Sequence, residues 1–106
     1  MRSRCIYFFS NRCLHKVKEE DIFFIRLHQG VCYLHTRHGV YKVHTSLRSF
    51  EGNRFHVSLS RSHRSVVVNM QHVTGMGFRS IFVNGMPLPL DPMYHKRLYP
   101  RFCRST

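Results

Sequence analysis

Leu59-Ser60-Arg61-Ser62-His63-Arg64-Ser65-Val66-Val67-Val68-Asn69 is the stretch that decides how the rest of the chain is interpreted, because its character changes halfway along. Residues 60–65 combine two arginines, one histidine and three serines, which are all donors suited to phosphates or base edges. Residues 66–68 are valines, and this β-branched run predicts a buried strand. The pattern fits a recognition loop held by a rigid strand, and it also fits a solvated turn before a core strand.

The charge of the chain indicates a polyanionic partner. Its 106 residues suffice for one domain with a single core, and 17 lysines and arginines stand against 5 acidic residues, for a formal net charge of +12. Nine histidines add positive charge below neutral pH. Because so much like charge opposes compaction, nucleic acid is the leading partner, and a membrane surface or an acidic protein is a competing one.

The sequence predicts a cytoplasmic protein that does not cross a membrane. No stretch approaches the roughly 18 apolar residues of a spanning helix, and no amphipathic helix is long enough to lie on a bilayer. Residues 1–9 begin with basic side chains, but their apolar run is too short for a signal peptide and is broken by residues 10–12.

The four cysteines give no zinc signature, because none of them forms a C-x-x-C pair. Free thiols are therefore expected in a reducing cytosol, and no cofactor is expected. A scattered metal site that uses the histidines stays open as an alternative. The cysteines are Cys5, Cys13, Cys32 and Cys103.

The first half of the chain predicts a β-meander. A hairpin is expected from strands at 6–9 and 14–17 around a turn at 10–12. Strands at 22–27, 31–36 and 40–44 follow, joined by three-residue turns that end in glycine.

The second half mixes strands with short helices. Ser46 is a suitable N-cap for a helix of about two turns that ends at Gly52, with Leu47 and Phe50 on one face. Alternation over 55–59 leads into the opening stretch, whose strand is expected to continue to Val73 before a flexible break at 75–77. Asn84-Gly85 predicts a hairpin between 78–83 and 86–90, with two prolines marking an edge strand. Asp91-Pro92 predicts the start of a helix over 93–99 that closes before Pro100, followed by a frayed tail.

An enzyme is not expected. Three of the five acids are adjacent, so a pair of catalytic carboxylates would need Glu51 or Asp91 to meet them. The chain has no G-x-S-x-G, P-loop or H-E-x-x-H motif.

Loops on a β framework are the expected binding elements. The predicted helices are too short for a helix-turn-helix, and the aromatic residues lie in apolar company that favours a core role over an RNA-stacking platform. Three groups of polar residues are candidates, and each also fits a solvated surface. They are His28 and Gln29, the cluster Arg61 to Ser65 with His63 and Arg64, and His95, Lys96 and Arg97.

The opening stretch resembles the F-x-R-x-H-R-S-x-x-V-N hallmark of the LytTR family of bacterial DNA-binding domains. Three further segments resemble that family: residues 20–25 its D-I-x-Y-I-E strand, residues 36–41 with Ser46-Leu47 its T-x-x-G-x-Y…S-L segment, and residues 88–94 its L-P-V-S-R-x-Y segment. The resemblance covers roughly residues 6–102 and is strongest over 20–99. It implies a single domain over 1–106, mainly β, with an elongated arrangement of small antiparallel sheets and one or two short helices.

The resemblance also implies a function, which is sequence-specific binding of double-stranded DNA for transcriptional regulation, in the manner of response-regulator output domains. Loops would enter successive major grooves, and two copies would bind imperfect direct repeats and bend the DNA. Base contacts would come from His28 and Gln29, with Val31 close by, and from Arg64. Arg61, Ser65 and Lys96 would hold phosphates.

One departure from the family pattern concerns the third contact. Asp91-Pro92 stands where the family has Ser-Arg, so His95, Lys96 or Arg97 would have to take over the contact. We expect a module without a preceding receiver domain, which would be a stand-alone regulator, a module controlled by a separate regulatory chain, or the product of a gene that has lost its control domain. A general RNA-binding or ribosome-associated module is the alternative function, and a His/Cys metal-binding interaction domain is a third.

Overall fold

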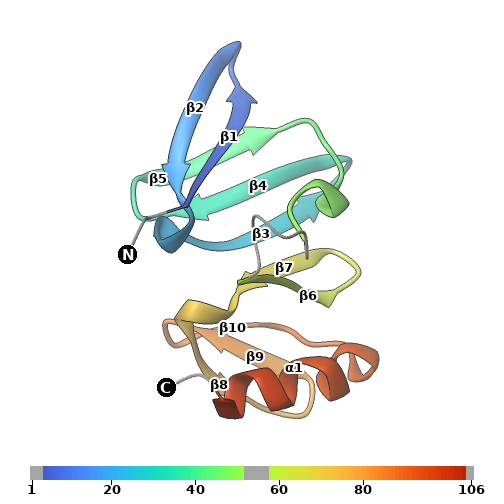
Figure 1. Ribbon diagram of the computed structural model, residues 1–106. Helices are drawn as coiled ribbons and strands as arrows, with labels where there is room; N and C mark the ends of the chain where they lie inside the picture. Colours follow the sequence, from blue (N-terminus) through green and yellow to red (C-terminus); the bar gives the residue numbers. More distant parts are fainter. Residues whose placement is uncertain (1–3, 52–57, 105–106) are drawn as a thin grey trace.

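Three small antiparallel sheets succeed one another from the top to the bottom of the computed structural model, and one helix lies at the lower end (Figure 1). The structure describes residues 4–51 and 58–104. The first sheet pairs β1 (Cys5–Ser10) with β2 (Cys13–Lys18). The middle sheet has the order β5-β4-β3-β7-β6, with β3 (Ile22–His28), β4 (Val31–Thr36), β5 (Gly39–Val43), β6 (Leu59–His63) and β7 (Val66–Asn69). The third has the order β10-β9-β8, with β8 (Val73–Met76), β9 (Ser80–Val83) and β10 (Met86–Pro89).

Short helical segments lie between the strands, and η1 and η3 of these connect one sheet to the next. Single 3-10 turns lie at η1 (Glu19–Asp21), η2 (Leu47–Ser49) and η3 (Met70–His72), and the chain closes with α1 (Pro92–Arg104). The expected mainly β fold of small antiparallel sheets is confirmed.

The hairpin turns are tighter than predicted. Asn11 and Arg12 have φ angles of 52° and 65°, and Gln29 and Gly30 have 50° and 78°. Both φ values are positive in each pair, as in the two-residue turn whose twist matches that of antiparallel strands. His28 is the last residue of β3 and pairs with Val31, so only two residues form the turn between them. The prediction of three-residue turns is wrong. The Asn84-Gly85 hairpin and the edge position of β10 are confirmed.

Strand β7 joins two hydrophobic cores. Val67 packs with Ile25 and the residues above the middle sheet, whereas Val66 and Val68 pack with Phe24 and the residues of the third sheet and α1. All three valines are fully buried, which confirms the strand predicted from this run. Burial of each such side chain contributes roughly 1.5–3 kcal/mol, so this short strand stabilises both halves of the fold.

Asn69 ends β7 and ties it to the start of β3. Its buried amide Nδ2 donates to the carbonyl oxygens of Glu19 at 2.9 Å and Ile22 at 2.8 Å, and its Oδ1 accepts from the N–H of Gln71 at 3.0 Å. The last bond caps η3, so the chain leaves the sheet at this point. The expectation that the strand continues to Val73 and then reaches a flexible break is wrong, since 73–76 form β8.

The segment after β5 is also shorter than expected. One 3-10 turn replaces the predicted two-turn helix, and Ser46 makes no side-chain capping bond. Leu47 and Phe50 are both buried, as their spacing predicted. The expected helix stop at Gly52 and the alternation at Phe55 and Val57 lie outside the described residues.

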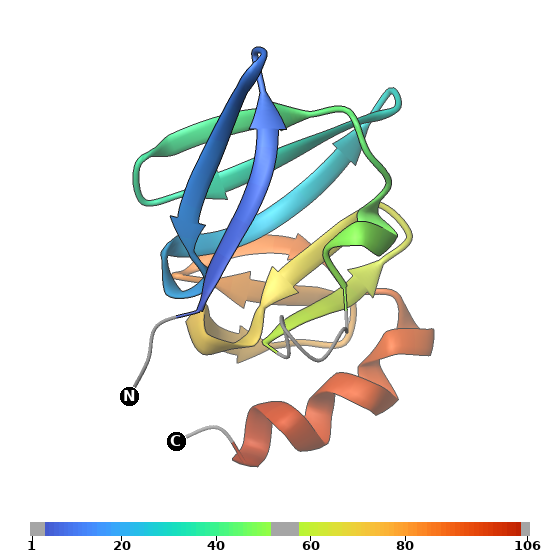
Figure 2. The same cartoon turned by 45° about the horizontal axis from the view of Figure 1, so that its top comes forward.

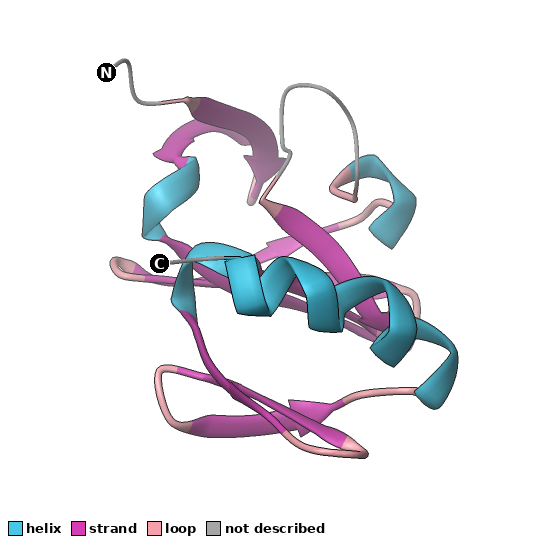
Figure 3. Ribbon diagram, turned by 60° about the horizontal axis from the view of Figure 1, so that its bottom comes forward, coloured by secondary structure: helices cyan, strands magenta, loops and turns pink. Residues whose placement is uncertain are grey.

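Helix α1 begins as predicted and ends later. The Oδ1 atom of Asp91 accepts from the N–H of Met93 at 2.9 Å, which confirms the N-cap. The helix then passes through Pro100 and continues to Arg104, so the predicted end before Pro100 and the frayed tail over 101–104 are wrong. Its apolar residues explain the extra length, since Leu98 is fully buried and Phe102 packs on the lower core. Helix α1 contacts β6 and β8, and Figure 3 shows it lying in front of the strands.

Candidate nucleic-acid interface

The turn between β6 and β7 consists of Arg64 and Ser65, and the described neighbours fix its backbone. The Nη1 atom of Arg61 donates to the carbonyl oxygen of Arg64 at 2.8 Å, and the N–H of Leu27 donates to that of Ser65 at 2.8 Å. The N–H of Ser65 donates to Nδ1 of His63 at 3.2 Å. Arg64 itself is exposed. The turn therefore presents one guanidinium from a backbone that has little freedom.

Arg61 has partners inside the fold. Its Nε donates to Oε2 of Glu51 at 2.6 Å, and its Nη2 completes an ion pair with the same oxygen. Both side chains are partly buried, so water screens this pair less than it screens a surface pair. This guanidinium therefore holds the Arg64 turn, and the contact with phosphate predicted for it stays a prediction.

Two of the serines in the opening stretch face inward. Ser62 is fully buried and donates from Oγ to the carbonyl oxygen of Pro89 at 3.1 Å, while Ser60 is 6 % exposed and accepts from Nη1 of Arg101. These two hydroxyls, which the sequence offers as donors suited to nucleic acid, instead attach β6 to the lower half of the molecule. Ser65 remains half-buried at the turn, with its Oγ 2.9 Å from Nδ1 of His63.

His28 and Gln29 lie at the turn between β3 and β4, where both are exposed. Arg26 precedes them on β3, pairs with Val66 across the sheet and is also exposed. It thus lies beside the Arg64 turn. Arg26 is not among the predicted binding residues, although the alternation of β3, together with its pairing with β7, places it beside the turn.

The first turns of α1 carry His95, Lys96 and Arg97. The ring of His95 stacks between those of Phe78 at 5.9 Å and Tyr99 at 5.6 Å, while Lys96 and Arg97 are exposed. Asp91, which stands in place of the family's Ser-Arg, serves as the helix cap described above. Its carboxylate is thereby directed to a backbone N–H of α1.

These three groups lie on one side of the molecule. In Figures 1 and 2 the β3–β4 turn, the β6–β7 turn and the start of α1 all appear on the right, whereas the β4–β5 turn lies on the left. Backbone bonds join them, because the N–H of Leu27 reaches Ser65 and the N–H of Asp91 reaches the carbonyl oxygen of Ser62 at 2.8 Å. We call this side the recognition face, defined by residues 28–29, 61–65 and 95–97.

The carboxylate of Asp21 is occupied elsewhere. It accepts from Nε of Arg37 at 3.0 Å and lies 3.4 Å from Nε2 of His38. The hydrogen bond from Arg37, with a smaller contribution from His38, lowers the pKa of Asp21 below its ordinary value of 3.8. The acid therefore remains ionised and compensates the charge of Arg37 on the β4–β5 turn.

The cysteines and the helix length bear on two further predictions. The cysteines at positions 5, 13, 32 and 103 are free thiols. Within residues 4–51 and 58–104, no helix combines the length and apolarity that crossing a membrane requires.

The fold and the recognition face define a mainly β binding domain that presents basic turns from a rigid framework. The LytTr DNA-binding domain model matches residues 12–98, and the chain belongs to this LytTR family. A solved structure with the same fold is the LytTr DNA-binding domain of a protein described as a methyl-accepting/DNA response regulator from Bacillus cereus. The two share 16 % identity with a TM-score of 0.72 over 97 % of this chain and 99 % of the other. No curated protein sequence matches the chain.

Family membership confirms the resemblance drawn from the sequence. It makes the chain a DNA-binding domain with DNA as its partner, and membership of this family implies a role in transcriptional regulation. The family is not catalytic, in agreement with the expectation that the chain is not an enzyme.

Proposed function

We propose that the recognition face reads a specific sequence of double-stranded DNA by placing its turns in successive major grooves. Arg64 would donate two hydrogen bonds to O6 and N7 of a guanine, the commonest base-specific contact of arginine. The observation that carries this assignment is that Arg64 is exposed while its carbonyl oxygen and both flanking residues are held by hydrogen bonds. A backbone fixed in this way suits a side chain that must meet one base.

The neighbouring turns supply the remaining contacts. His28 and Gln29 would reach base edges one groove away, and Lys96 and Arg97 would neutralise phosphates near the start of α1. Arg61, His63 and Ser65 would position the Arg64 turn, and Ser65 and His95 would add hydrogen bonds to the backbone of the DNA. Arg26 would add charge between the first two turns.

We propose that two copies of the domain bind an imperfect direct repeat. A single domain of this size reaches only a short stretch of duplex, so a second copy would increase both affinity and specificity. We further propose that the protein acts in the bacterial cytoplasm and that a separate regulatory chain controls it.

Selection of binding sites from random duplexes tests this function. A direct-repeat motif is expected, with a guanine at one position that Arg64→Ala no longer requires. This substitution should cost about 1–3 kcal/mol at the selected site. Lys96→Ala should weaken binding to every sequence alike and reduce the slope of log affinity against log salt by about one.

Arg37→Ala is the matched control, since it removes the same charge from the opposite side of the molecule and should leave the selected motif unchanged. Competition with single-stranded DNA and duplex RNA separates the alternatives. Preference for either competitor, or full affinity in Arg64→Ala, would refute the proposed mode of binding.

A further inference from the structure

A cavity of about 440 Å³ lies between the N-terminal hairpin and the segment that runs from β5 to η2. Residues 6–12 form one wall, and residues 43–45 with Ser49 and Phe50 form the other. Its volume is within the range of sites that take small organic molecules. None of the residues of the recognition face lines it, so the DNA-binding function does not account for it.

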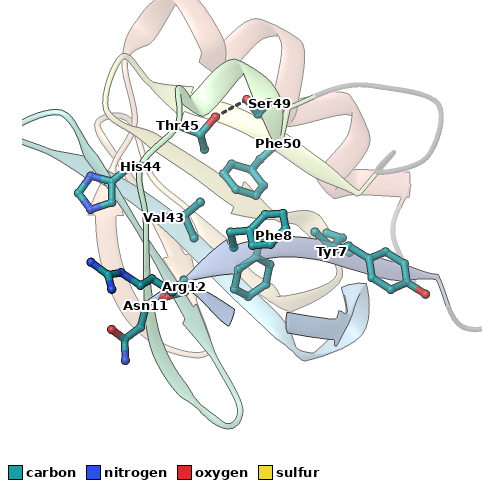
Figure 4. A pocket seen from close by; sticks show the side chains of 12 residues that line it. Tyr7, Phe8, Asn11, Arg12, Val43, His44, Thr45, Ser49 and Phe50 are labelled. Atoms are coloured by element: carbon teal, nitrogen blue, oxygen red, sulfur yellow. Dashed lines mark hydrogen bonds between the residues drawn. The ribbon is translucent and has the colours of Figure 1, made fainter. Parts of the chain in front are cut away.

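The bottom of the cavity is apolar. Phe8, Val43 and Phe50 are each about nine-tenths or more buried, and their side chains gather at the centre of the site in Figure 4. Aromatic and branched aliphatic surfaces of this kind bind flat apolar groups by excluding water from both partners. The interior of the cavity is therefore suited to the apolar part of a ligand.

The rim carries one positive charge. Among the described residues that line the cavity, Arg12 is the only arginine or lysine, and its φ of 65° places the backbone in the left-handed region that favours glycine. An arginine there costs about 1–2 kcal/mol relative to an ordinary conformation. Figure 4 shows Arg12 and His44 on one side of the cavity.

No carboxylate opposes this charge within the cavity, since the described lining contains neither Asp nor Glu. On the other wall, the hydroxyls of Thr45 and Ser49 are 2.8 Å apart and bonded to each other, as the dashed line in Figure 4 marks. Hydroxyls can rotate to donate to an anionic oxygen as well. The rim thus offers a cation and several neutral donors around an apolar interior.

We propose that this cavity binds a small organic anion that has a flat apolar body and one carboxylate. The body lies against Phe8, Val43 and Phe50, and the carboxylate accepts hydrogen bonds from the guanidinium of Arg12. Arginine suits this role because its planar fork matches the two oxygens of a carboxylate. The site gives the domain a place to bind a small molecule that is separate from its DNA-binding turns.

Two matched probes test the proposal by NMR titration of the purified chain: naphthalene-2-carboxylate and its neutral analogue naphthalene-2-carboxamide. The carboxylate is expected to bind saturably at millimolar concentration, with shifts concentrated at residues 6–12 and 43–50. The carboxamide should bind about tenfold more weakly, the loss expected for one charge-assisted contact.

Arg12→Gln should weaken the carboxylate by about tenfold while leaving the carboxamide unchanged. Lys16→Gln is its control, because it removes the same charge from the same hairpin at an exposed position that does not line the cavity. Ser49→Tyr should fill the entrance and abolish binding of both probes. Dispersed amide spectra establish that each variant is folded.

The proposal is overturned by equal affinity for the two probes, by wild-type affinity in Arg12→Gln, or by shifts that centre on the recognition face. Absence of saturable binding to either probe overturns it as well. None of these outcomes bears on DNA binding, which the selection experiment tests independently.

Discussion

Substitution of Asn69 by alanine should destabilise the domain strongly without touching its surface. The side chain is fully buried and makes three hydrogen bonds, to the carbonyl oxygens of Glu19 and Ile22 and from the N–H of Gln71. A net contribution of about 1 kcal/mol for each bond gives a loss of about 3 kcal/mol. Domains of this size are stable by only about 5–15 kcal/mol, so the loss is a large share of the total.

Urea unfolding followed by circular dichroism measures this loss. Asn69→Ala should shift the midpoint to lower urea with an unchanged slope, because the surface exposed on unfolding stays nearly the same. Gln71→Ala is the control, since Gln71 is exposed and its side chain makes one bond, to Oγ of Ser58 at 3.0 Å. It should cost at most about 1 kcal/mol. A loss below about 1 kcal/mol in Asn69→Ala would show that these bonds do not hold β7 to β3.

Three further predictions concern charge, pH and the helix. Glu51→Gln should free the guanidinium of Arg61 to contact DNA. Filter-binding should then show tighter binding to random duplexes, poorer discrimination of the selected site, and a slope of log affinity against log salt that is steeper by about one. An unchanged slope would contradict this prediction. Burial, with a smaller effect of Arg26, lowers the pKa of His35 below its ordinary 6.5, so the unfolded chain binds more protons and stability should fall as the pH decreases through 6.5. In urea titrations across this range, His35→Phe should show a shallower decline, and an identical decline would refute the assignment. Pro100→Ala should restore a backbone hydrogen-bond donor inside α1 and increase the free energy of unfolding by about 1–3 kcal/mol, which a higher melting temperature would report. A lower melting temperature would show that the proline ring makes contacts that the helix needs.

The strands could be predicted well because their signals are local. The valines at 66–68 and the Asn84-Gly85 pair specify a buried strand and a hairpin through side-chain branching and turn geometry. The cap at Asp91 is equally local. Each of these depends on residues adjacent in sequence, and the structure confirms all three.

The errors concern features that depend on partners distant in sequence. Nothing near Ser62 indicates that it bonds to Pro89, 27 residues away, and no local signal pairs Arg61 with Glu51. The length of α1 was misjudged because Pro100 predicts a stop, whereas packing of Leu98 and the residues after it on the lower core outweighs the lost hydrogen bond. Residue types on the recognition face were visible in the sequence, but the internal partners of its arginines and serines were not.

The packing of β7 into both hydrophobic cores has a consequence for how the domain discriminates between DNA sequences. Val67 belongs to the upper core and its two neighbours to the lower one, so the strand that leads out of the Arg64 turn cannot loosen while either core is intact. A loop that is already ordered loses little conformational entropy when a duplex arrives. Under the proposed mode of binding, such a loop would not reshape itself to suit a different base, so a mismatch would leave its donors unpaired. The stiffness of three consecutive valines would then make the domain intolerant of the wrong sequence.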